Sequence, residues 1–388
     1  MSILNHSPTI VRDGLVLCLD AGAVRSYPIF RGSNLITNGE FTTNTTGWAG
    51  YGGTTISRVT ASSDPGVPSG GTDDYCLKVN GTYFAYDPIS TTTGKHYFVR
   101  LRGYDASGGN SLKISATSDG ATLTGVPEVT VSGAEWKTYT SSFIAEGTTT
   151  YIRIGANSGG GSVSYWDKVE VYEAIWADLS GYDNDAVLNG IDGLSAESGA
   201  GGTRSFDFDG TSDYMTISNP SFAADGFTNG LTCEAWLRFD TASLSGSDTG
   251  FITRYSASAQ SQFLFGFREA GVGNIGLTLY QIDDSNNAVG LDYDQDWTPA
   301  TDRWYHVVAV YIPSTKVEIF VDGQSEFSVT SNIPSQLNDD STLDVMIGNF
   351  VGGTYFNGKM AILRMYNRAL TIGEAQQNYR THKGRFGL

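Results

Sequence analysis

Short segments in which apolar and polar side chains alternate constrain this sequence more than any other feature. In His96–Arg102, the side chains of Tyr97, Val99 and Leu101 share one face of an extended chain. Turns rich in glycine and serine, such as Asn157–Ser162, separate such segments. The same period of two recurs in Trp136–Phe143, Tyr151–Ile154 and Lys168–Tyr172. Many short, half-buried strands joined by such turns predict stacked antiparallel sheets, as in a sandwich or jelly roll.

The second half of the chain has the same character. Its clearest predicted strands are Arg204–Phe208, Leu231–Phe239, Gln262–Phe267, Ile275–Gln281, Trp304–Tyr311, Lys316–Val321 and Met360–Tyr366. Near the start of the chain, the short apolar run Gly14–Asp20 predicts one further, buried strand. The pairs Asp322-Gly323 and Asp209-Gly210 suit tight hairpin turns. Thr371 followed by Glu374 predicts a capping box and one short helix near the C-terminus. The predicted fold class is all-β, with two sandwich domains and that single helix.

Composition and charge narrow the function classes. The chain of 388 residues is 40% hydrophobic and only 17% charged, which is typical of a globular protein. Its formal net charge of −17 argues against nucleic acid and anionic membranes as partners. No apolar stretch is long enough to span a membrane, and the first residues lack the pattern of a secretory signal. Three widely spaced cysteines indicate small buried side chains rather than a zinc site or a disulfide scaffold. We therefore expect a soluble protein that folds in a cytoplasm, with no membrane insertion.

The C-terminal part of the chain resembles the laminin-G-like, concanavalin A-like lectin/glucanase superfamily. Ordered motifs over much of this part carry the resemblance: Trp176-Ala-Asp-Leu-Ser-Gly181, Phe206-Asp-Phe-Asp-Gly-Thr-Ser-Asp-Tyr214, Leu231-Thr-Cys-Glu-Ala-Trp236, Arg303-Trp-Tyr-His-Val-Val308, Ile319-Phe-Val-Asp-Gly323 and Gly358–Tyr366. The resemblance implies a sandwich that displays or recognises carbohydrate.

The middle part is similar to the jelly rolls of carbohydrate-binding modules, from Asn34-Leu-Ile-Thr-Asn-Gly-Glu-Phe41 to Tyr165-Trp-Asp-Lys-Val-Glu-Val171. The opening Gly14-Leu-Val-Leu-Cys-Leu-Asp-Ala21 resembles the start of the lectin-like domain in tailed-bacteriophage virion proteins, where it leads almost directly into the Asp-Leu-Ser-Gly segment. We therefore expect residues 30–173 to be an inserted jelly roll, and residues 1–29 to complete the sandwich of residues 174–388.

The closing Asn378–Leu388 also resembles phage structural proteins. Together the two ends imply a non-enzymatic virion protein (fibre, tail-associated or capsid-surface) that is made in the host cytoplasm. Its expected partners are other virion proteins, further copies of itself as a homo-oligomer, and host-surface glycan. The alternative is a secreted carbohydrate-active enzyme or its accessory binding protein.

One segment is a candidate for catalysis. A strand over Asp292-Tyr-Asp-Gln-Asp296 would place three carboxylates on one face, as glucanases of the resembled superfamily do with their acidic residues. The family pattern uses glutamates, and no Glu-x-Asp-x-Glu occurs in this chain. An acidic edge that blunts sheet-to-sheet aggregation is the competing interpretation, and we favour it. His306 has no nucleophile motif beside it, so no catalytic residue is predicted.

Calcium is the one cofactor that the resemblance implies. Carbohydrate-module jelly rolls often hold a structural Ca²⁺ between their first and last strands, and Asn38, Glu40 and Asp167 occupy the matching positions here. In the lectin-like part, Asp209 and Asp213 flank a loop that can present oxygen ligands. Asx-turns explain the same residues without a metal.

Sugar recognition needs exposed aromatic faces. The tryptophans Trp48, Trp136, Trp166, Trp236 and Trp304 stand at family core positions and are expected inside. The candidate sugar-contacting residues are the remaining aromatics Tyr51, Tyr83, Tyr86, Tyr104, Tyr293 and Trp297. Each of them could equally lie at an interface or at the edge of the core.

Overall fold

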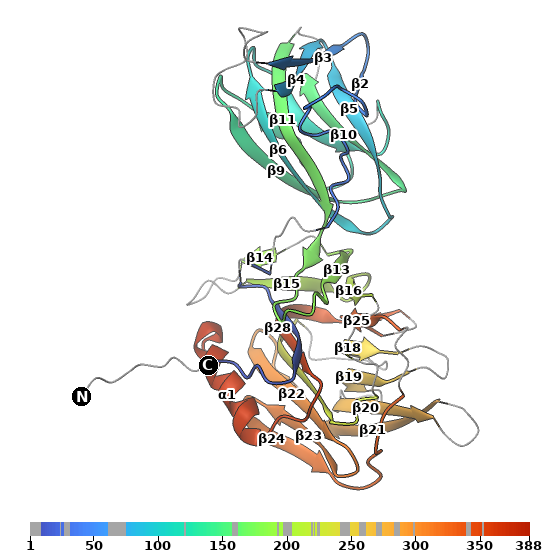
Figure 1. The fold of residues 1–388 in the computed structure, drawn as a ribbon. Helices are drawn as coiled ribbons and strands as arrows, with labels where there is room; N and C mark the ends of the chain where they lie inside the picture. The colour runs from blue at the N-terminus through green and yellow to red at the C-terminus, as the bar shows by residue number, and fades with distance from the viewer. Residues whose placement is uncertain are drawn as a thin grey trace. The chain divides into compact units, whose positions relative to one another are not determined.

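The computed structural model describes residues 9–23, 25–26, 32–60, 75–119, 122–156, 162–191, 194–196, 204–218, 220, 222, 226–240, 249–255, 261–268, 274–282, 288–297, 299–338, 343–350 and 353–388. The chain divides into two compact units: a larger unit of Met1–Ile29 with Ile175–Leu388, and a smaller unit of Phe30–Ala174. Both units are built of antiparallel strands, with one short α-helix near the C-terminus in the described part (Figure 1). The predicted all-β fold is confirmed.

The smaller unit contains two five-stranded sheets. One has the order β2-β5-β10-β7-β8, formed by Ala49–Gly50, Phe84–Ser90, Thr149–Ala156, Asn110–Ser115 and Val129–Val131. The other has the order β3-β4-β11-β6-β9, formed by Thr55–Thr60, Tyr75–Gly81, Ser162–Glu173, His96–Asp105 and Lys137–Ile144.

The core of the smaller unit lies between these sheets. On β6, Tyr97, Val99 and Leu101 are buried, as their alternation predicts, and they join Ile152 and Ile154 of the opposite sheet in one cluster. The expected core tryptophans Trp48 and Trp166 are in this cluster too. Burial of so many aliphatic and aromatic side chains is the main stabilising contribution to a unit of this size.

The larger unit contains two eight-stranded sheets. The first has the order β14-β15-β28-β17-β22-β23-β24, with β1 also paired to β28; its strands are Leu194–Ala196, Arg204–Asp209, Asn357–Tyr366, Leu231–Phe239, Trp304–Ile312, Lys316–Val321, Gln324–Val329 and, for β1, Leu15–Asp20. The second has the order β12-β13-β16-β25-β18-β19-β20-β21, formed by Ile175–Trp176, Ala186–Asn189, Tyr214–Ile217, Val345–Ile347, Thr249–Arg254, Phe263–Arg268, Asn274–Ile282 and Ala288–Asp296. A small ribbon pairs β26 (Asn349–Phe350) with β27 (Thr354–Tyr355).

The first strand, β1, is held by residues that follow the smaller unit in sequence. The backbone N–H of Cys18 donates to Asp178 Oδ1 at 2.8 Å, and Asn184 Nδ2 donates to Val16 O at 2.8 Å. Further along, Ala177 N donates to Ser26 O at 2.8 Å. The two parts of the larger unit are therefore joined by hydrogen bonds around the Asp178-Leu-Ser-Gly181 motif.

The helix α1 spans Ile372–His382 and begins with the predicted capping box, in which Thr371 and Glu374 exchange hydrogen bonds. A 3₁₀ turn at Lys383–Phe386 follows. Tyr379 of the helix lies parallel to the buried Trp236 ring, with centroids 6.0 Å apart. The helix therefore covers the outer face of the sheet that contains β17.

Four polar side chains are buried between this helix and the sheet. Glu234 accepts from Arg364 Nη1 at 2.5 Å and from Asn378 Nδ2 at 2.6 Å, and His306 Nε2 lies 3.1 Å from Glu234 Oε1. Burial opposes ionisation of Glu234, but the charge of Arg364 and the hydrogen bonds with His306 and Asn378 together outweigh it and lower the pKa of Glu234 to about 2. The buried negative charge is thus compensated by the arginine.

The two predicted Asp-Gly turns differ. Asp322 and Gly323 have φ of 51° and 74° and join β23 to β24 in the expected tight hairpin. The prediction for Asp209-Gly210 is wrong, because β15 and β16 on either side belong to different sheets. The loop there crosses from one sheet to the other, so its Asp-Gly pair forms a turn that does not join two paired strands.

Within the described residues, no helix has the length and apolarity needed to cross a membrane.

Candidate functional site

Tyrosine rings gather on the outward face of the β2-β5-β10-β7-β8 sheet of the smaller unit. The Tyr51 ring stacks on Phe84 with centroids 5.0 Å apart, and Tyr83 meets Tyr51 edge to face at 5.7 Å. On the same sheet, Tyr86 of β5 lies 5.8 Å from Tyr151 of β10. We call the surface formed by Tyr51, Tyr83, Tyr86 and Tyr151 the tyrosine face. Three of the predicted sugar-contacting residues are therefore brought together.

The backbone holds the most exposed of these rings in place. Tyr83 is 40% exposed, and its backbone N–H donates to Thr54 Oγ1 while its carbonyl accepts from Ala156 N. A Cβ at Gly52, where φ is +58°, would come within 2.5 Å of the Tyr83 ring. A side chain at Gly52 would collide with this ring, so the close approach of the ring to the backbone requires glycine there.

Basic side chains lie beside the tyrosines. The Arg153 guanidinium sits 3.6 Å from the centroid of the Phe84 ring, and burial lowers the pKa of Arg153. Lys113 is Arg153's partner on the neighbouring strand β7 and is paired with Glu128 at 3.1 Å. A cation over an aromatic ring is stabilised by the ring's quadrupole. The face therefore combines ring surfaces with hydrogen-bond donors.

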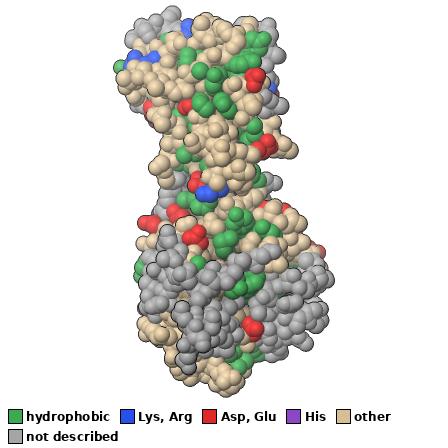
Figure 2. Space-filling model, turned by 90° about the vertical axis from the view of Figure 1, so that its right-hand side faces the viewer, with side chains coloured by type: hydrophobic (Ala, Val, Ile, Leu, Met, Phe, Trp, Pro, Cys, Tyr) green, Lys and Arg blue, Asp and Glu red, His purple; other side chains and the backbone are tan. Residues whose placement is uncertain are grey.

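Such a surface suits a ligand that has both apolar C–H faces and hydroxyl groups. Tyrosine offers a rigid ring and a hydroxyl at its tip with few rotamers to lose on binding. Figure 2, which shows the molecule from the right-hand side of Figure 1, has green, hydrophobic side chains gathered on the surface of the smaller unit.

A second aromatic group lies on the outward face of the other sheet. Tyr104 of β6 lies 5.9 Å from Trp136 and 6.0 Å from Tyr165, and the Arg102 guanidinium is 5.4 Å from the Trp136 ring. Trp136 is half-buried against these outward residues, so its predicted place in the core is wrong. It directly precedes β9, on which Tyr139 and Phe143 pack on the core, and the alternation of the strand places Trp136 on the opposite, outward face.

A shallow groove of about 270 Å³ lies on the same face as Arg102. Its lining includes Glu40, Arg100, Thr138, Lys168 and Glu170. Arg100 and Glu170 form a close pair, with Nε and Nη2 both within 2.7 Å of one carboxylate oxygen. The basic and acidic side chains of this groove therefore form ion pairs with each other, Arg100 with Glu170 and Lys168 with Glu40.

The two predicted aromatic residues of the larger unit lie elsewhere. Tyr293 is buried, and its hydroxyl donates to Asn332 O at 2.6 Å. Trp297 packs against Phe239, Phe267 and Tyr305 at centroid distances of 5.9, 6.2 and 5.0 Å. Both rings pack within the larger unit, whereas the tyrosine face belongs to the smaller unit.

The first set of candidate calcium ligands has protein partners. The Asn38 amide nitrogen donates to the carbonyls of Asn44 and Thr46. Glu40 lies 3.9 Å from Lys168 Nζ, and Asp167 Oδ2 lies 3.9 Å from Arg102 Nη1. Burial raises the pKa of Asp167 to about 6, against the opposing effect of the Lys168 backbone hydrogen bond. Each carboxylate has a basic group 3.9 Å away, and Asp167 Oδ2 accepts no hydrogen bond from the described residues, so calcium binding by this set stays a prediction.

The second set of candidate calcium ligands, Asp209 and Asp213, forms hydrogen bonds within its own loop. Asp209 Oδ1 accepts from the backbone N–H groups of Thr211 and Ser212, each at 2.8 Å, and Asp213 Oδ2 accepts from Asp209 N at 3.0 Å. Burial opposes ionisation of Asp209, but these hydrogen bonds outweigh it and hold its pKa below the usual range. This is an Asx-type turn, in which backbone N–H groups bond to Asp209 Oδ1 and the Thr211 and Ser212 hydroxyls bond to Asp209 Oδ2. No cluster of three or more acidic, histidine or cysteine side chains that could hold a metal occurs in the described part of either unit.

The acidic segment of the larger unit forms β21, the last strand in the order of its sheet. Asp292 is exposed and accepts from Thr278 Oγ1 at 2.8 Å; the side chains of Asp294 and Asp296 lie outside the described residues. His306 is completely buried against Glu234. Asp292 lies at a sheet edge, and His306 has no exposed surface from which to reach a substrate.

The fold defines an all-β protein built of sandwich-type sheets, with a group of tyrosine rings on one outward sheet face. Residues 209–376, less than half of the chain, match the family model of the concanavalin A-like lectin/glucanases superfamily. The match lies in the larger unit and confirms the lectin-like resemblance of that part. No curated protein matches the chain.

Several solved structures are similar to about half of this chain. Domain 4 of AbnA, a GH43 extracellular arabinanase from Geobacillus stearothermophilus, in complex with arabinotriose, is 17% identical over 52% of this chain and 92% of that chain, with a TM-score of 0.38. The receptor binding domain of the botulinum neurotoxin C/D mosaic serotype is 15% identical over 52% and 48%, with a TM-score of 0.40. The binding domain of botulinum neurotoxin DC in complex with SialylT is 10% identical over 53% and 48%, with a TM-score of 0.41. The match spans about half the length of the botulinum chains.

Proposed function

We propose that this chain is a non-catalytic glycan-binding protein, and that the tyrosine face is its sugar-contacting surface. The observation that carries the proposal is the arrangement of Tyr51, Tyr83, Tyr86 and Tyr151 on one outward sheet face, with the Tyr83 ring packed against Gly52. Sugar rings present C–H groups to aromatic faces and hydroxyls to nearby polar groups. A rigid platform reduces the entropy lost on binding.

We further infer that the protein is a structural component of a bacteriophage virion, made in the host cytoplasm. The resemblance of both chain ends to tailed-phage proteins supports this setting. A fibre, tail-associated or capsid-surface position would bring the tyrosine face to a host-surface glycan, with other virion proteins and further copies of the chain as partners. The net charge of −17 suits such a partner better than nucleic acid.

A secreted carbohydrate-active enzyme, or its accessory binding protein, is the second candidate. The match of residues 209–376 to a superfamily that includes glucanases favours it. The two candidates differ in whether glycan is cleaved. Incubating the full chain with any glycan that it binds, and measuring new reducing ends, separates them; we expect none to form.

A glycan array probed with the full chain tests the proposed face. We expect Tyr83→Ala and Tyr151→Ala each to weaken binding about tenfold, because losing one ring contact costs about 1–1.5 kcal/mol. Tyr182→Ala is the matched control, since Tyr182 is 55% exposed and lies in the larger unit. If the array is blank, or if both face variants bind like the control, the proposal is wrong.

Mass spectrometry of purified phage particles tests the proposed location. We expect peptides of this chain in a fixed ratio to the major capsid protein. Their absence from intact particles, with the chain present only in the lysate, would contradict the virion role while leaving glycan binding open to the array.

A further inference from the structure

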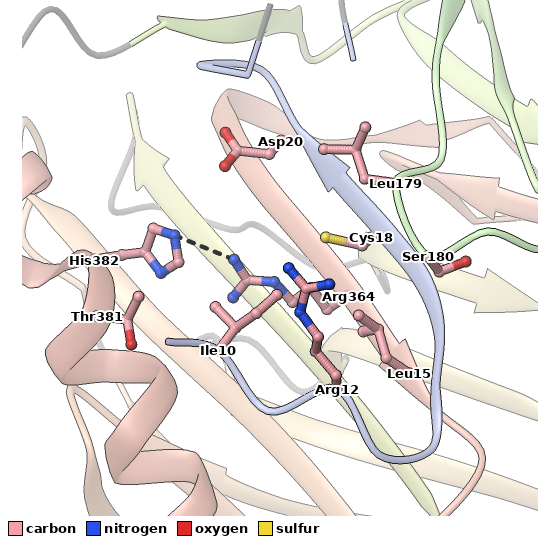
Figure 3. A pocket seen from close by; sticks show the side chains of 10 residues that line it. All are labelled: Ile10, Arg12, Leu15, Cys18, Asp20, Leu179, Ser180, Arg364, Thr381 and His382. Atoms are coloured by element: carbon pink, nitrogen blue, oxygen red, sulfur yellow. Dashed lines mark hydrogen bonds between the residues drawn. The ribbon is translucent and has the colours of Figure 1, made fainter. Parts of the chain in front are cut away.

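A cavity of about 270 Å³ in the larger unit is not part of the tyrosine face. It lies between β1, β28, the end of α1 and the Leu179-Ser180 segment (Figure 3). Ile10, Leu15 and Leu179 supply apolar lining, and Arg12 and Arg364 supply two guanidinium groups. The cavity is large enough for one small organic molecule.

Arg364 has an unused donor in this cavity. Its side chain is 1% exposed; Nη1 donates to Glu234, and Nη2 lies 3.4 Å from His382 Nε2. The Nε–H group has no hydrogen-bond partner among the residues that the structure describes. A buried donor left without an acceptor is costly, and a ligand oxygen would relieve that cost.

Arg12 adds a second positive charge at the cavity. Its side chain is exposed and, within the described residues, forms no ion pair or hydrogen bond. Figure 3 shows the Arg12 and Arg364 side chains converging in the centre of the cavity. Two guanidinium groups on one cavity favour an anion that bridges them.

The other ionisable groups of the cavity do not cancel this charge. Asp20 is already paired with Arg385 at 2.7 Å. Burial raises the pKa of Cys18, against the opposing effects of the Arg364 charge and of a side-chain hydrogen bond between Arg364 and Cys18, so the thiol remains neutral. Burial and Arg364 lower the pKa of His382 to about 4, so this ring is neutral at pH 7. Because Glu234 compensates Arg364, Arg12 leaves the site with about one net positive charge.

We propose that this cavity binds a small organic carboxylate. The carboxylate accepts hydrogen bonds from Arg12 and from Arg364 Nε, and the apolar body of the ligand packs against Ile10, Leu15 and Leu179. A single net charge and an apolar wall suit a carboxylate better than a compact, doubly charged anion such as phosphate. The site is independent of glycan binding, since it belongs to the other unit.

Isothermal titration calorimetry of the full chain with benzoate at low salt tests the proposal. Benzamide serves as the neutral ligand of the same shape, and inorganic phosphate as the compact anion. We expect benzoate to bind, and benzamide and phosphate to bind at least tenfold more weakly. Arg12→Gln should weaken benzoate binding about tenfold, because one charge-assisted hydrogen bond is lost.

Arg380→Gln is the matched control. Arg380 is an exposed arginine of α1, the helix whose end lines the cavity, but Arg380 itself does not line it. It should bind benzoate like the unaltered chain. The proposal is overturned if benzoate gives no binding heat at tens of millimolar, if Arg12→Gln binds it as well as the control does, or if benzamide or phosphate binds equally tightly. None of these results would affect the glycan-array outcome.

Discussion

Asp87 places an ionisable carboxyl inside the smaller unit, on the strand that carries Tyr86. Its side chain is 5% exposed and points toward the core, opposite to the tyrosine face. Burial raises the pKa of Asp87 to about 7. The folded state therefore holds this proton at pH values where the unfolded chain, with a pKa near 3.9, has released it.

The contribution of Asp87 to the free energy of unfolding must fall as the pH rises. The contribution of the protonated carboxyl is complete below about pH 4, and it is lost as the pH rises through the folded pKa near 7. Asn mimics the protonated form, so Asp87→Asn should match the unaltered chain at pH 4. At pH 8 it should be more stable by a few kcal/mol, since each pKa unit is worth about 1.4 kcal/mol.

Urea unfolding at both pH values measures this difference. Asp119→Asn is the control, because Asp119 is an exposed carboxylate of the same unit. Equal stabilities of Asp87→Asn and the unaltered chain at pH 8 would mean that the buried carboxyl ionises without cost.

At the scale of elements, the capping box of α1 gives a further prediction. Thr371 Oγ1 accepts from Glu374 N, and Glu374 also accepts from Arg368 at 2.6 Å. Thr371→Ala removes the cap and should lower the free energy of unfolding by about 1 kcal/mol. Thermal or urea unfolding measures the loss, with Thr301→Ala at an exposed loop position as control. A loss no larger than the control's would show that tertiary packing alone fixes the helix.

The sequence predicts elements well where a local pattern is decisive. Alternation located β6, and the Asp322-Gly323 pair located its hairpin, because both signals lie within a few residues. The Asp209-Gly210 turn shows the limit: the local signal is a turn, but which sheets it joins depends on distant strands.

Prediction of the candidate site has the same limit. Tyr51, Tyr83 and Tyr86 were identifiable as aromatics outside the expected core, yet only strand pairing brings Tyr151 beside them. Tyr293 alternates as regularly as Tyr86, but its face turned out to point inward. The Arg12–Arg364 cavity had no sequence signal, because its residues are separated by most of the chain.

For the whole molecule, the decisive feature is where the chain leaves and re-enters the larger unit. Ala177 N donates to Ser26 O at 2.8 Å, and Ser26 Oγ donates to Ala177 O at 2.6 Å. The smaller unit closes on itself as well, since Leu35 N donates to Val171 O and Asn34 Oδ1 accepts from Val171 N. Each unit thus brings its own chain ends together, as expected for a module inserted into a loop.

Replacing residues 30–174 with a short Gly/Ser linker should therefore leave the larger unit folded. The linker starts and ends within three residues of Ser26 and Ala177, which are hydrogen-bonded to each other, so closing the loop costs little entropy. The strand β1 keeps its pairing with β28. Circular dichroism and thermal unfolding should show a cooperative β protein, and the fragment 30–174 should fold alone with the tyrosine face intact. A control variant of the shortened chain, Leu17→Asp, places a charge at a fully buried β1 position and should abolish folding. If the shortened chain is unfolded while the fragment folds, β1 depends on the smaller unit, and the insertion interpretation fails.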